Sequence, residues 1–275
     1  MNPKSVLDQH GIAPKKSLGQ NFLHDPNLLQ KIVATAELRP GDTALEIGPG
    51  TGALTVLLAQ AARRVIAIEL DERLKPVLDR ALEPYRNAWV IYQDALTVDI
   101  PMLVRPDDYV VVANLPYYIT SAILRHVLES EQPPRRLVLT VQAEVAERLI
   151  AQPPDMGLLS ISVQYFGQPR IVTRLKPGVF WPRPEVDSAV VRIDTYDRPP
   201  VDVPDVQTFF RVVRAGFGQK RKQLKNSISS GLGLSSEATN ALFETAEIDP
   251  RRRAETLSLE EWAALTRAFA VTLWS

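Results

Sequence analysis

Ala44-Leu-Glu-Ile-Gly-Pro-Gly-Thr-Gly52 is the stretch that decides the predicted fold. Its apolar start predicts a strand at 44–47, and the amphipathic residues that follow predict a helix at 52–62. Glycines at positions 48, 50 and 52 let the backbone turn tightly and come close to a ligand. The stretch therefore predicts a strand–turn–helix unit that binds a nucleotide, although a tight turn without a ligand could use the same glycines.

Short apolar runs alternate with helical stretches on both sides of this turn. We expect further helices at 26–38 and 72–82, and further strands at 65–69, 89–92, 109–113 and 137–141. This alternation indicates βαβ units and a mostly parallel sheet. Two later runs, at 159–165 and 189–193, lack a full helix between them and predict an antiparallel edge hairpin. The sequence thus predicts an α/β protein with a Rossmann-like sheet.

A proline-rich stretch separates this pattern from the end of the chain. Residues 197–204 contain three prolines and predict a linker, after which the pattern is helical with no convincing strand. We therefore predict an α/β domain at 1–198 and a small all-α domain at 199–275.

The composition is that of a soluble globular protein without cysteine chemistry. The 275 residues include no cysteine and three scattered histidines, which excludes disulfides and thiolate catalysis and leads us to expect no metal site. No apolar run is long enough to span a bilayer, and the N-terminus lacks the apolar core of a signal peptide. We expect a cytoplasmic monomer with no membrane partner.

The charges are segregated along the chain. The 32 acidic and 32 basic residues give a formal net charge of zero, which by itself argues against a nucleic-acid partner. However, residues 156–184 contain four bases and no acid, and residues 206–236 contain six bases and no acid. These segments predict a local phosphate-contacting surface, although a basic run is often only a solvated face.

Three acidic residues fall at the ends of successive predicted strands. Glu46 lies inside the first strand, Glu69 lies 21 residues after Gly48, and Asp94 closes the third strand. An acid at the position of Glu69 can hold a ribose diol of either NAD or S-adenosylmethionine. Asp94 can accept a hydrogen bond from an adenine amine, but could also be an ordinary turn residue. Together with the G-x-G-x-G spacing, the three acids favour an S-adenosylmethionine-dependent methyltransferase over a dehydrogenase.

Asn114-Leu-Pro-Tyr117 ends a predicted buried strand and carries the most specific chemistry. An amine attached to a purine is a poor nucleophile, because its lone pair is delocalised. An asparagine oxygen and a backbone carbonyl can accept its two hydrogens. Tyr117 can stack on the base, which is worth roughly 1–3 kcal/mol. The alternative is a strand-end turn with Tyr117 in the core.

These motifs resemble the adenine-N6 methyltransferases, and four further stretches resemble one branch of them. That branch is the ribosomal RNA adenine dimethyltransferases that act on two adjacent adenosines near the 3′ end of small-subunit (16S) rRNA. The resemblance covers residues 15 to 270, and the stretches are Lys15-Lys-Ser-Leu-Gly-Gln-Asn-Phe-Leu23, Val179-Phe-Trp-Pro-Arg-Pro-Glu-Val-Asp-Ser-Ala189, Phe217-Gly-Gln-Lys-Arg-Lys-Gln-Leu-Lys-Asn226 and Arg253-Ala-Glu-Thr-Leu-Ser258. The resemblance implies a class I methyltransferase fold that uses S-adenosylmethionine to give N6,N6-dimethyladenosines in an immature 30S particle.

The resemblance also implies roles for individual residues. The predicted catalytic residues are Asn114, Leu115, Pro116, Tyr117 and Phe180, with Phe180 stacked on the target adenine. The predicted cofactor-binding residues are Gln20, Asn21, Leu23, Gly48, Gly50, Glu69, Leu70, Asp94, Ala95 and Asn114. The predicted RNA-binding residues are Arg174, Lys176, Arg183, Lys220, Arg221, Lys222 and Lys225.

Three other functions stay open at this point. A ribosome-assembly factor could use the same motifs with catalysis secondary to binding. A large-subunit rRNA adenine dimethyltransferase is less consistent with the C-terminal motifs. A NAD-dependent oxidoreductase is disfavoured by Asn114-Leu-Pro-Tyr117 and by the lack of a second substrate domain.

Overall fold

The computed structural model describes residues 2–116, 119–219 and 221–274, without the side chains of 272–274. The chain divides into two compact units. One contains Met1–Glu147 and Gln168–Thr195, and the other contains Arg148–Gly167 and Tyr196–Ser275. Residues 148–167, which the sequence-based division puts in the α/β domain, thus belong to the same compact unit as the C-terminal helices.

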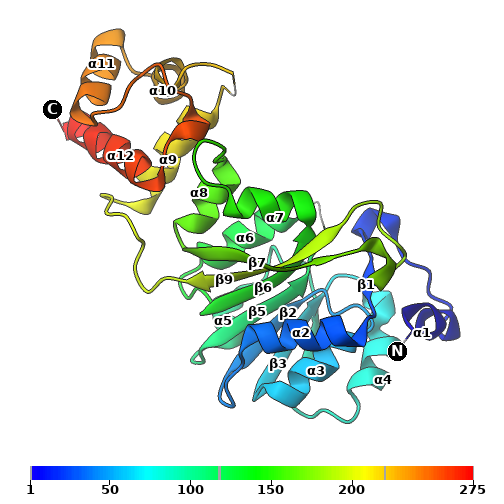
Figure 1. The fold of residues 1–275 in the computed structure, drawn as a ribbon. Helices are drawn as coiled ribbons and strands as arrows, with labels where there is room; N and C mark the ends of the chain where they lie inside the picture. The colour runs from blue at the N-terminus through cyan, green and yellow to red at the C-terminus, as the bar shows by residue number, and fades with distance from the viewer. Residues whose placement is uncertain (1, 117–118, 220, 275) are drawn as a thin grey trace. The chain divides into compact units, whose positions relative to one another are not determined.

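The first unit is built on a mixed sheet (Figure 1). Its strands in the described residues are β2 (Thr43–Ile47), β3 (Arg64–Glu69), β4 (Ala88–Tyr92), β5 (Tyr109–Asn114), β6 (Arg136–Gln142), β7 (Gly167–Leu175) and β9 (Ser188–Thr195). They lie in the order β4-β3-β2-β5-β6-β9-β7. The first five are paired in parallel, and β9 runs antiparallel to β6. The predicted mostly parallel sheet with an antiparallel edge is confirmed.

Helices connect and cover these strands. Those of the first unit in the described residues are α1 (Pro3–Gln9), α2 (Pro26–Ala36), α3 (Ala53–Ala61), α4 (Lys75–Leu82), α5 (Ile100–Val104), α6 (Thr120–Leu128) and α7 (Ala143–Ile150), the last of which ends in the second unit. Figure 1 shows α2 and α3 in front of the sheet and α6 behind it. Asp25 begins α2 as predicted, because its carboxylate accepts hydrogen bonds from the backbone of Asn27 and Leu28.

The order of the strands places the functional loops together at the carboxyl ends of the parallel strands. β2 lies between β3 and β5, so the chain leaves β2 toward one side and later returns on the other. Ligands of such sheets bind at this switch point, beside the carboxyl ends of the strands. The turn after β2, the end of β3 and the end of β5 therefore meet there.

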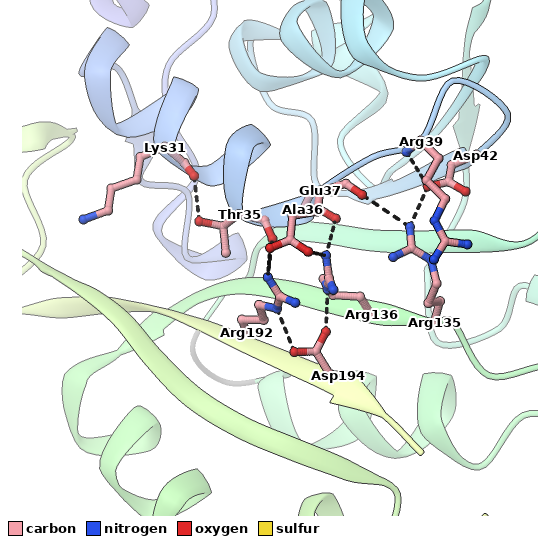
Figure 2. A network of polar contacts seen from close by, with 10 residues as sticks. All are labelled: Lys31, Thr35, Ala36, Glu37, Arg39, Asp42, Arg135, Arg136, Arg192 and Asp194. Atoms are coloured by element: carbon pink, nitrogen blue, oxygen red, sulfur yellow. Dashed lines mark hydrogen bonds and ion pairs between the residues drawn. The ribbon is translucent and has the colours of Figure 1, made fainter. Parts of the chain in front are cut away.

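An ionic network of two buried arginines and two exposed carboxylates joins the amino end of β6 and the carboxyl end of β9 to the end of α2 (Figure 2). Arg136 donates to Glu37 at 2.8 Å and to Asp194 at 2.5 Å, and Arg192 donates to the same two carboxylates. Both arginine side chains are less than a tenth exposed. Two shared carboxylates compensate two buried cations, so α2 is fixed against β6 and β9.

A small two-stranded sheet lies apart from the main one. β1 (Phe22–Leu23) pairs antiparallel with β8 (Phe180–Trp181), with Phe22 opposite Trp181 and Leu23 opposite Phe180. This pairing joins two of the stretches on which the family resemblance rests.

The second unit is helical. Its helices in the described residues are α8 (Leu158–Gln164), α9 (Val206–Phe217), α10 (Leu224–Leu232), α11 (Ser236–Thr245) and α12 (Leu259–Trp274). Its core is aromatic: Tyr165 stacks on Phe209 with a centroid distance of 4.7 Å, and Trp262 stacks on Phe217 at 5.5 Å. The predicted helical C-terminal segment is confirmed.

The strand predicted at 159–165 is wrong, because α8 occupies this segment. Ile161 and Tyr165, four residues apart on the helix, are buried in the core of the second unit with Phe209. A short apolar run fits a buried helix as well as a strand, and packing decides between them. The partner of β9 at the sheet edge is β7, whose mixture of polar and apolar residues gave no clear strand signal.

Candidate active site

A cavity lies at the carboxyl edge of the sheet, where β2, β3, β4 and β5 end. It is lined by Leu18, Gly19, Gln20, Asn21, Phe22, Ile47, Gly48, Gly50, Ile68, Glu69, Leu70, Leu74, Gln93, Asp94, Ala95, Asn114, Leu115, Pro116 and Ile119. Most of the predicted cofactor-binding residues are in this lining, although they come from five separate parts of the sequence. The structure therefore brings the N-terminal segment, the glycine turn and the acceptor motif to one site.

The backbone of the glycine turn has the left-handed conformation that glycines allow. Gly48, Gly50 and Gly52 all have positive φ, between 58° and 80°. A Cβ on Gly50 would lie 2.8 Å from the Phe22 ring, so a side chain there would displace the N-terminal segment. Phe22 was not predicted as a site residue, although it stands beside Asn21 in one of the quoted stretches.

Glu69 fastens the glycine turn to the end of β3. One of its carboxylate oxygens accepts from the Gly50 backbone at 3.1 Å, and the other accepts from the Asp71 backbone at 2.8 Å. Burial raises the pKa of Glu69, and these backbone N–H groups oppose that rise. A carboxylate oxygen has two lone pairs, so Glu69 can still accept a hydrogen bond from a ribose hydroxyl.

Asp94, Leu70 and Ala95 form the part of the lining that suits an adenine ring. Asp94 uses Oδ1 to accept from the Leu96 backbone at 2.9 Å. Among the described residues its Oδ2 has no hydrogen-bond partner, so it can accept from a ligand amine. Leu70 is half exposed and Ala95 is buried, and both give the lining apolar surface that can contact a ring.

The N-terminal segment is held over the cavity by Asp71, a residue that the sequence analysis did not identify. Gln20 donates to Asp71 at 2.9 Å, while Arg73 donates to both of its oxygens. The Asp71 side chain is 2% exposed. Hydrogen bonding from Arg73 is the largest cause that lowers the pKa of Asp71 to about 2. Asp71 is therefore ionised at neutral pH and fixes the position of Gln20.

Asn114 is oriented by the same segment. Its side-chain amide nitrogen donates to the backbone carbonyl of Asn21 at 2.8 Å. This bond assigns the nitrogen to the N-terminal segment, so Oδ1 is the atom of this side chain that could accept a hydrogen bond from an amine. The backbone of Leu115 is held by the carbonyl of Thr140 at 3.1 Å, and Pro116 also lines the cavity.

Two of the predicted catalytic and cofactor-binding residues, Leu23 and Phe180, do not line this cavity. Leu23 and Phe180 are 6% and 3% exposed and belong to the core cluster beneath α2 and α3. Tyr117 lies outside the described residues. The predicted contacts of Leu23 with the cofactor, and of Phe180 and Tyr117 with adenine, stay predictions.

Glu46 is in the interior instead of the cavity lining. It is 1% exposed, and its Oε2 has no hydrogen-bond partner among the described residues. Burial raises the pKa of Glu46 to about 8, and the charge of Glu69 adds to this rise. The carboxyl group is therefore mostly protonated at neutral pH, unlike a ligand-binding carboxylate.

The predicted RNA-binding residues differ in whether they form ion pairs with acidic side chains. Arg174 and Lys176 are exposed but form ion pairs with Glu147 and Asp187. The others in the described range have no ion pair: Arg183, Arg221, Lys222 and Lys225. Lys220 lies outside the described residues.

Within the described residues, no helix is long and apolar enough to cross a membrane. In the same residues, no group of three or more histidine, aspartate and glutamate side chains is arranged to hold a metal ion.

The geometry fits S-adenosylmethionine. A buried carboxylate beside the glycine turn suits a ribose diol, and Asp94 with Leu70 and Ala95 suits an adenine ring. Asn114 at the neighbouring strand end presents an amide oxygen to an amine, which a hydride-transfer site does not need. The fold and site define an S-adenosylmethionine-dependent methyltransferase of class I.

Comparisons with known proteins narrow this class. A family model described as ribosomal RNA adenine dimethylase matches residues 12–270. The chain is therefore a member of the ribosomal RNA adenine dimethylase family. It is 46% identical to ribosomal RNA small subunit methyltransferase A of Geobacillus sp. (strain WCH70), over 96% of this chain and 94% of the relative. It is 47% identical to the protein of the same name in Moorella thermoacetica, over 96% and 95%.

Solved structures agree with this placement. The chain resembles a dimethyladenosine transferase from Plasmodium falciparum with a TM-score of 0.78 and 25% identity, over 91% of this chain and 98% of that one. It resembles the 23S rRNA methyltransferase ErmE with a TM-score of 0.72 and 28% identity, over 90% of this chain and 99% of that one. The predicted family, fold class, cofactor and enzyme class are confirmed.

Proposed function

We propose that this enzyme methylates the N6 amines of two adjacent adenosines near the 3′ end of small-subunit rRNA. The product on each base is N6,N6-dimethyladenosine, made during assembly of the 30S subunit. The observation that carries the proposal is Asn114, which lies at the cavity edge with its amide nitrogen bonded to Asn21. Support for the substrate comes from relatives at 46–47% identity that are named small-subunit rRNA methyltransferases.

Asn114 makes the adenine amine a better nucleophile. Its Oδ1 accepts one amine hydrogen and the carbonyl of Leu115 or Pro116 accepts the other, which draws the nitrogen lone pair out of the ring system. The bound cofactor supplies an electrophilic methyl group on a sulfonium, a good leaving group. Transfer of that methyl group would form the new N–C bond and break the S–C bond, and the amine proton would then pass to solvent. Positioning by Asn114 supplies much of the rate. Because the amine loses its proton only after attack, no dedicated general base is proposed.

The remaining motif residues bind and align the base. Pro116 restricts the backbone of Leu115 to an extended conformation, which suits a carbonyl directed at the amine. Tyr117 stacks on one face of the adenine, whereas Phe180, which is 3% exposed in the core cluster, would have to leave that core to stack on the other face. An adenine can enter only from a single-stranded loop or after extrusion from a helix.

The basic residues without acidic partners contact rRNA phosphates. Arg183, Arg221, Lys222 and Lys225 are free of ion pairs within the described residues, and Lys220 belongs to the same basic run. Arg174 and Lys176 would have to exchange Glu147 and Asp187 for phosphate. Such contacts fix orientation and do not read sequence, so target choice comes from the shape of the rRNA and its particle. We place the enzyme in the cytoplasm as a monomer that acts on an immature 30S particle.

One observation favours a second candidate. The structural similarity to the 23S rRNA methyltransferase ErmE is consistent with a large-subunit rRNA substrate. The higher identity to small-subunit enzymes favours the first.

Transfer of labelled methyl groups separates the two candidates. The enzyme is incubated with labelled S-adenosylmethionine and either undermethylated small subunits or protein-free large-subunit rRNA. We expect label in the small subunits alone. Label confined to large-subunit rRNA would reverse the proposed substrate, and binding to small subunits without any label would favour an assembly factor.

A further inference from the structure

A depression on the second unit, separate from the basic residues discussed above, has the properties of a phosphate site. It lies where α9 meets α10 and is lined by Arg211, Arg214, Ala215, Gly218, Gln219, Ser227, Ser230 and Gly231. Its sides thus consist of two arginines, two hydroxyl residues and one amide, and no acidic side chain lines it.

The floor of this depression is made of backbone and small residues. A Cβ on Gly231 would lie 2.6 Å from the Cβ of Ala215, so the two helices touch at this point. Gly218 adds a third position without a long side chain. A flat ligand group can therefore approach the floor, while long side chains reach it from the rim.

The two arginines of the rim have no carboxylate partner among the described residues. Arg211 and Arg214 are both exposed and stand three residues apart, so they project from neighbouring turns of α9. Other arginines of the same unit are paired: Arg252 with Glu261, and Arg267 with Glu260. Two guanidinium groups that lack carboxylate partners and lie next to a depression are available to bind an anion.

Neighbouring contacts hold the rim in place. The guanidinium carbon of Arg211 lies 5.4 Å from the ring centroid of Phe269, which is buried in α12. Ser227 is buried and donates to the backbone carbonyl of Gln219 at 3.4 Å. Ser230, one turn further along α10, is exposed and can donate its hydroxyl to a ligand.

We propose that this depression binds a phosphodiester of the RNA backbone, with Arg211 and Arg214 as its two charged donors. Arginine presents a planar fork of N–H groups that matches phosphate oxygens, and the hydroxyl of Ser230 adds a neutral donor. RNA is favoured over an acidic protein because the proposed function, on which this inference rests, already requires rRNA binding. Sequence alone places the two arginines in a basic run, whereas the structure adds the facing residues of α10.

Salt-dependent RNA binding tests the site. The affinity of the full chain for a transcribed 3′ fragment of small-subunit rRNA is measured over a range of KCl concentrations. The variant is Arg211→Gln/Arg214→Gln, and Arg211→Lys/Arg214→Lys keeps the charge. The matched control is Arg80→Gln/Arg86→Gln, which removes two exposed arginines that also have no ion pair in the described part of the chain.

We expect the Gln variant to bind about tenfold more weakly at fixed salt. Each lost phosphate contact removes roughly 0.7–0.9 from the slope of log affinity against log salt, so the slope should fall by about 1–2. The Arg80/Arg86 control should stay near wild type. The Lys variant should keep the wild-type salt slope, because its charge is unchanged, but bind more weakly than wild type, because the fork of N–H donors is lost. Ser230→Glu, which places a negative charge at the rim, should weaken binding without loss of fold.

An unchanged slope in the Gln variant, or an equal change in the Arg80/Arg86 control, would overturn the site. Failure of the proposed function gives a different result: wild type would then transfer no methyl group to small subunits, whatever the slopes. The slope of the Gln variant therefore tests the depression, and methyl transfer by wild type tests the function.

Discussion

Asp71 acts on the active site through other residues. Its buried carboxylate joins Arg73 from its own segment to Gln20 from the N-terminal segment, and Gln20 lines the cavity. The next residue, Asn21, supplies the carbonyl that orients Asn114. A single side chain outside the cavity lining therefore positions both a proposed cofactor-binding residue and a proposed acceptor-binding residue.

Asp71→Asn should weaken cofactor binding, because an amide nitrogen cannot accept from Arg73. We expect the affinity for S-adenosylhomocysteine, measured by calorimetry, to fall about tenfold, equivalent to about 1.4 kcal/mol. Hydrogen exchange of residues 13–23 should become faster in the variant. Asp79→Asn is the control, since Asp79 is exposed and pairs only with Lys75. Unchanged affinity and exchange in Asp71→Asn would show that Asp71 does not position the segment.

Glu46 should make stability depend on pH. Its pKa is about 8 in the folded chain and lies near 4.5 in an unfolded one, so between these values the folded state holds a proton that the unfolded state releases. The free energy of unfolding should therefore fall as pH rises through this window, at up to about 1.4 kcal/mol per pH unit.

Glu46→Gln removes this titration while keeping the shape of the side chain. Urea unfolding at several pH values between 5 and 8.5 should show the variant gaining stability relative to wild type as pH rises. Parallel pH profiles for the two proteins would contradict the buried, protonated state of Glu46.

At the scale of elements, α9 and α12 are in contact at a glycine. A Cβ on Gly216 would lie 2.3 Å from the ring of Trp262, which is fully buried and cannot move away. The two helices can therefore pack at this distance only with glycine at position 216.

Gly216→Ala should destabilise the second unit by about 1–3 kcal/mol, the usual cost of overpacking a core. Chemical unfolding followed by tryptophan fluorescence measures it, in a background where Trp89, Trp181 and Trp274 are replaced by phenylalanine so that the signal comes from Trp262. Gly157→Ala in the same unit is the control, because its Cβ would meet nothing within 4 Å. Equal stability of the Gly216 variant and the control would contradict the observed packing.

The elements that the sequence predicts well are those specified locally. The strand and helix around the glycine turn are observed at 43–47 and 53–61, within one residue of their predicted ends. α8 was predicted as a strand, because only its packing against α9 distinguishes the two structures. Asp71 could not be identified, because its partner Gln20 lies 51 residues away and only the fold joins them.

At the scale of the whole molecule, a net charge of zero conceals two different surfaces. The buried Glu69 and the exposed Asp94 line the cofactor cavity, where their carboxylates suit a cationic sulfonium and an adenosine. The arginines of the α9–α10 depression and the basic run after it have no acid within residues 206–236. RNA affinity should therefore be local and strongly dependent on salt.

The most direct test of the account is to map the methyl groups that the enzyme adds to rRNA, with and without the Asn114 side chain. Undermethylated small subunits are incubated with S-adenosylmethionine and either wild type or Asn114→Ala, and rRNA digests are analysed by mass spectrometry. We predict two adjacent N6,N6-dimethyladenosines near the 3′ end with wild type and none with the variant, whose rRNA affinity stays within about twofold. Wild type that leaves these adenosines unmodified, or a variant that loses binding together with methylation, would contradict the account.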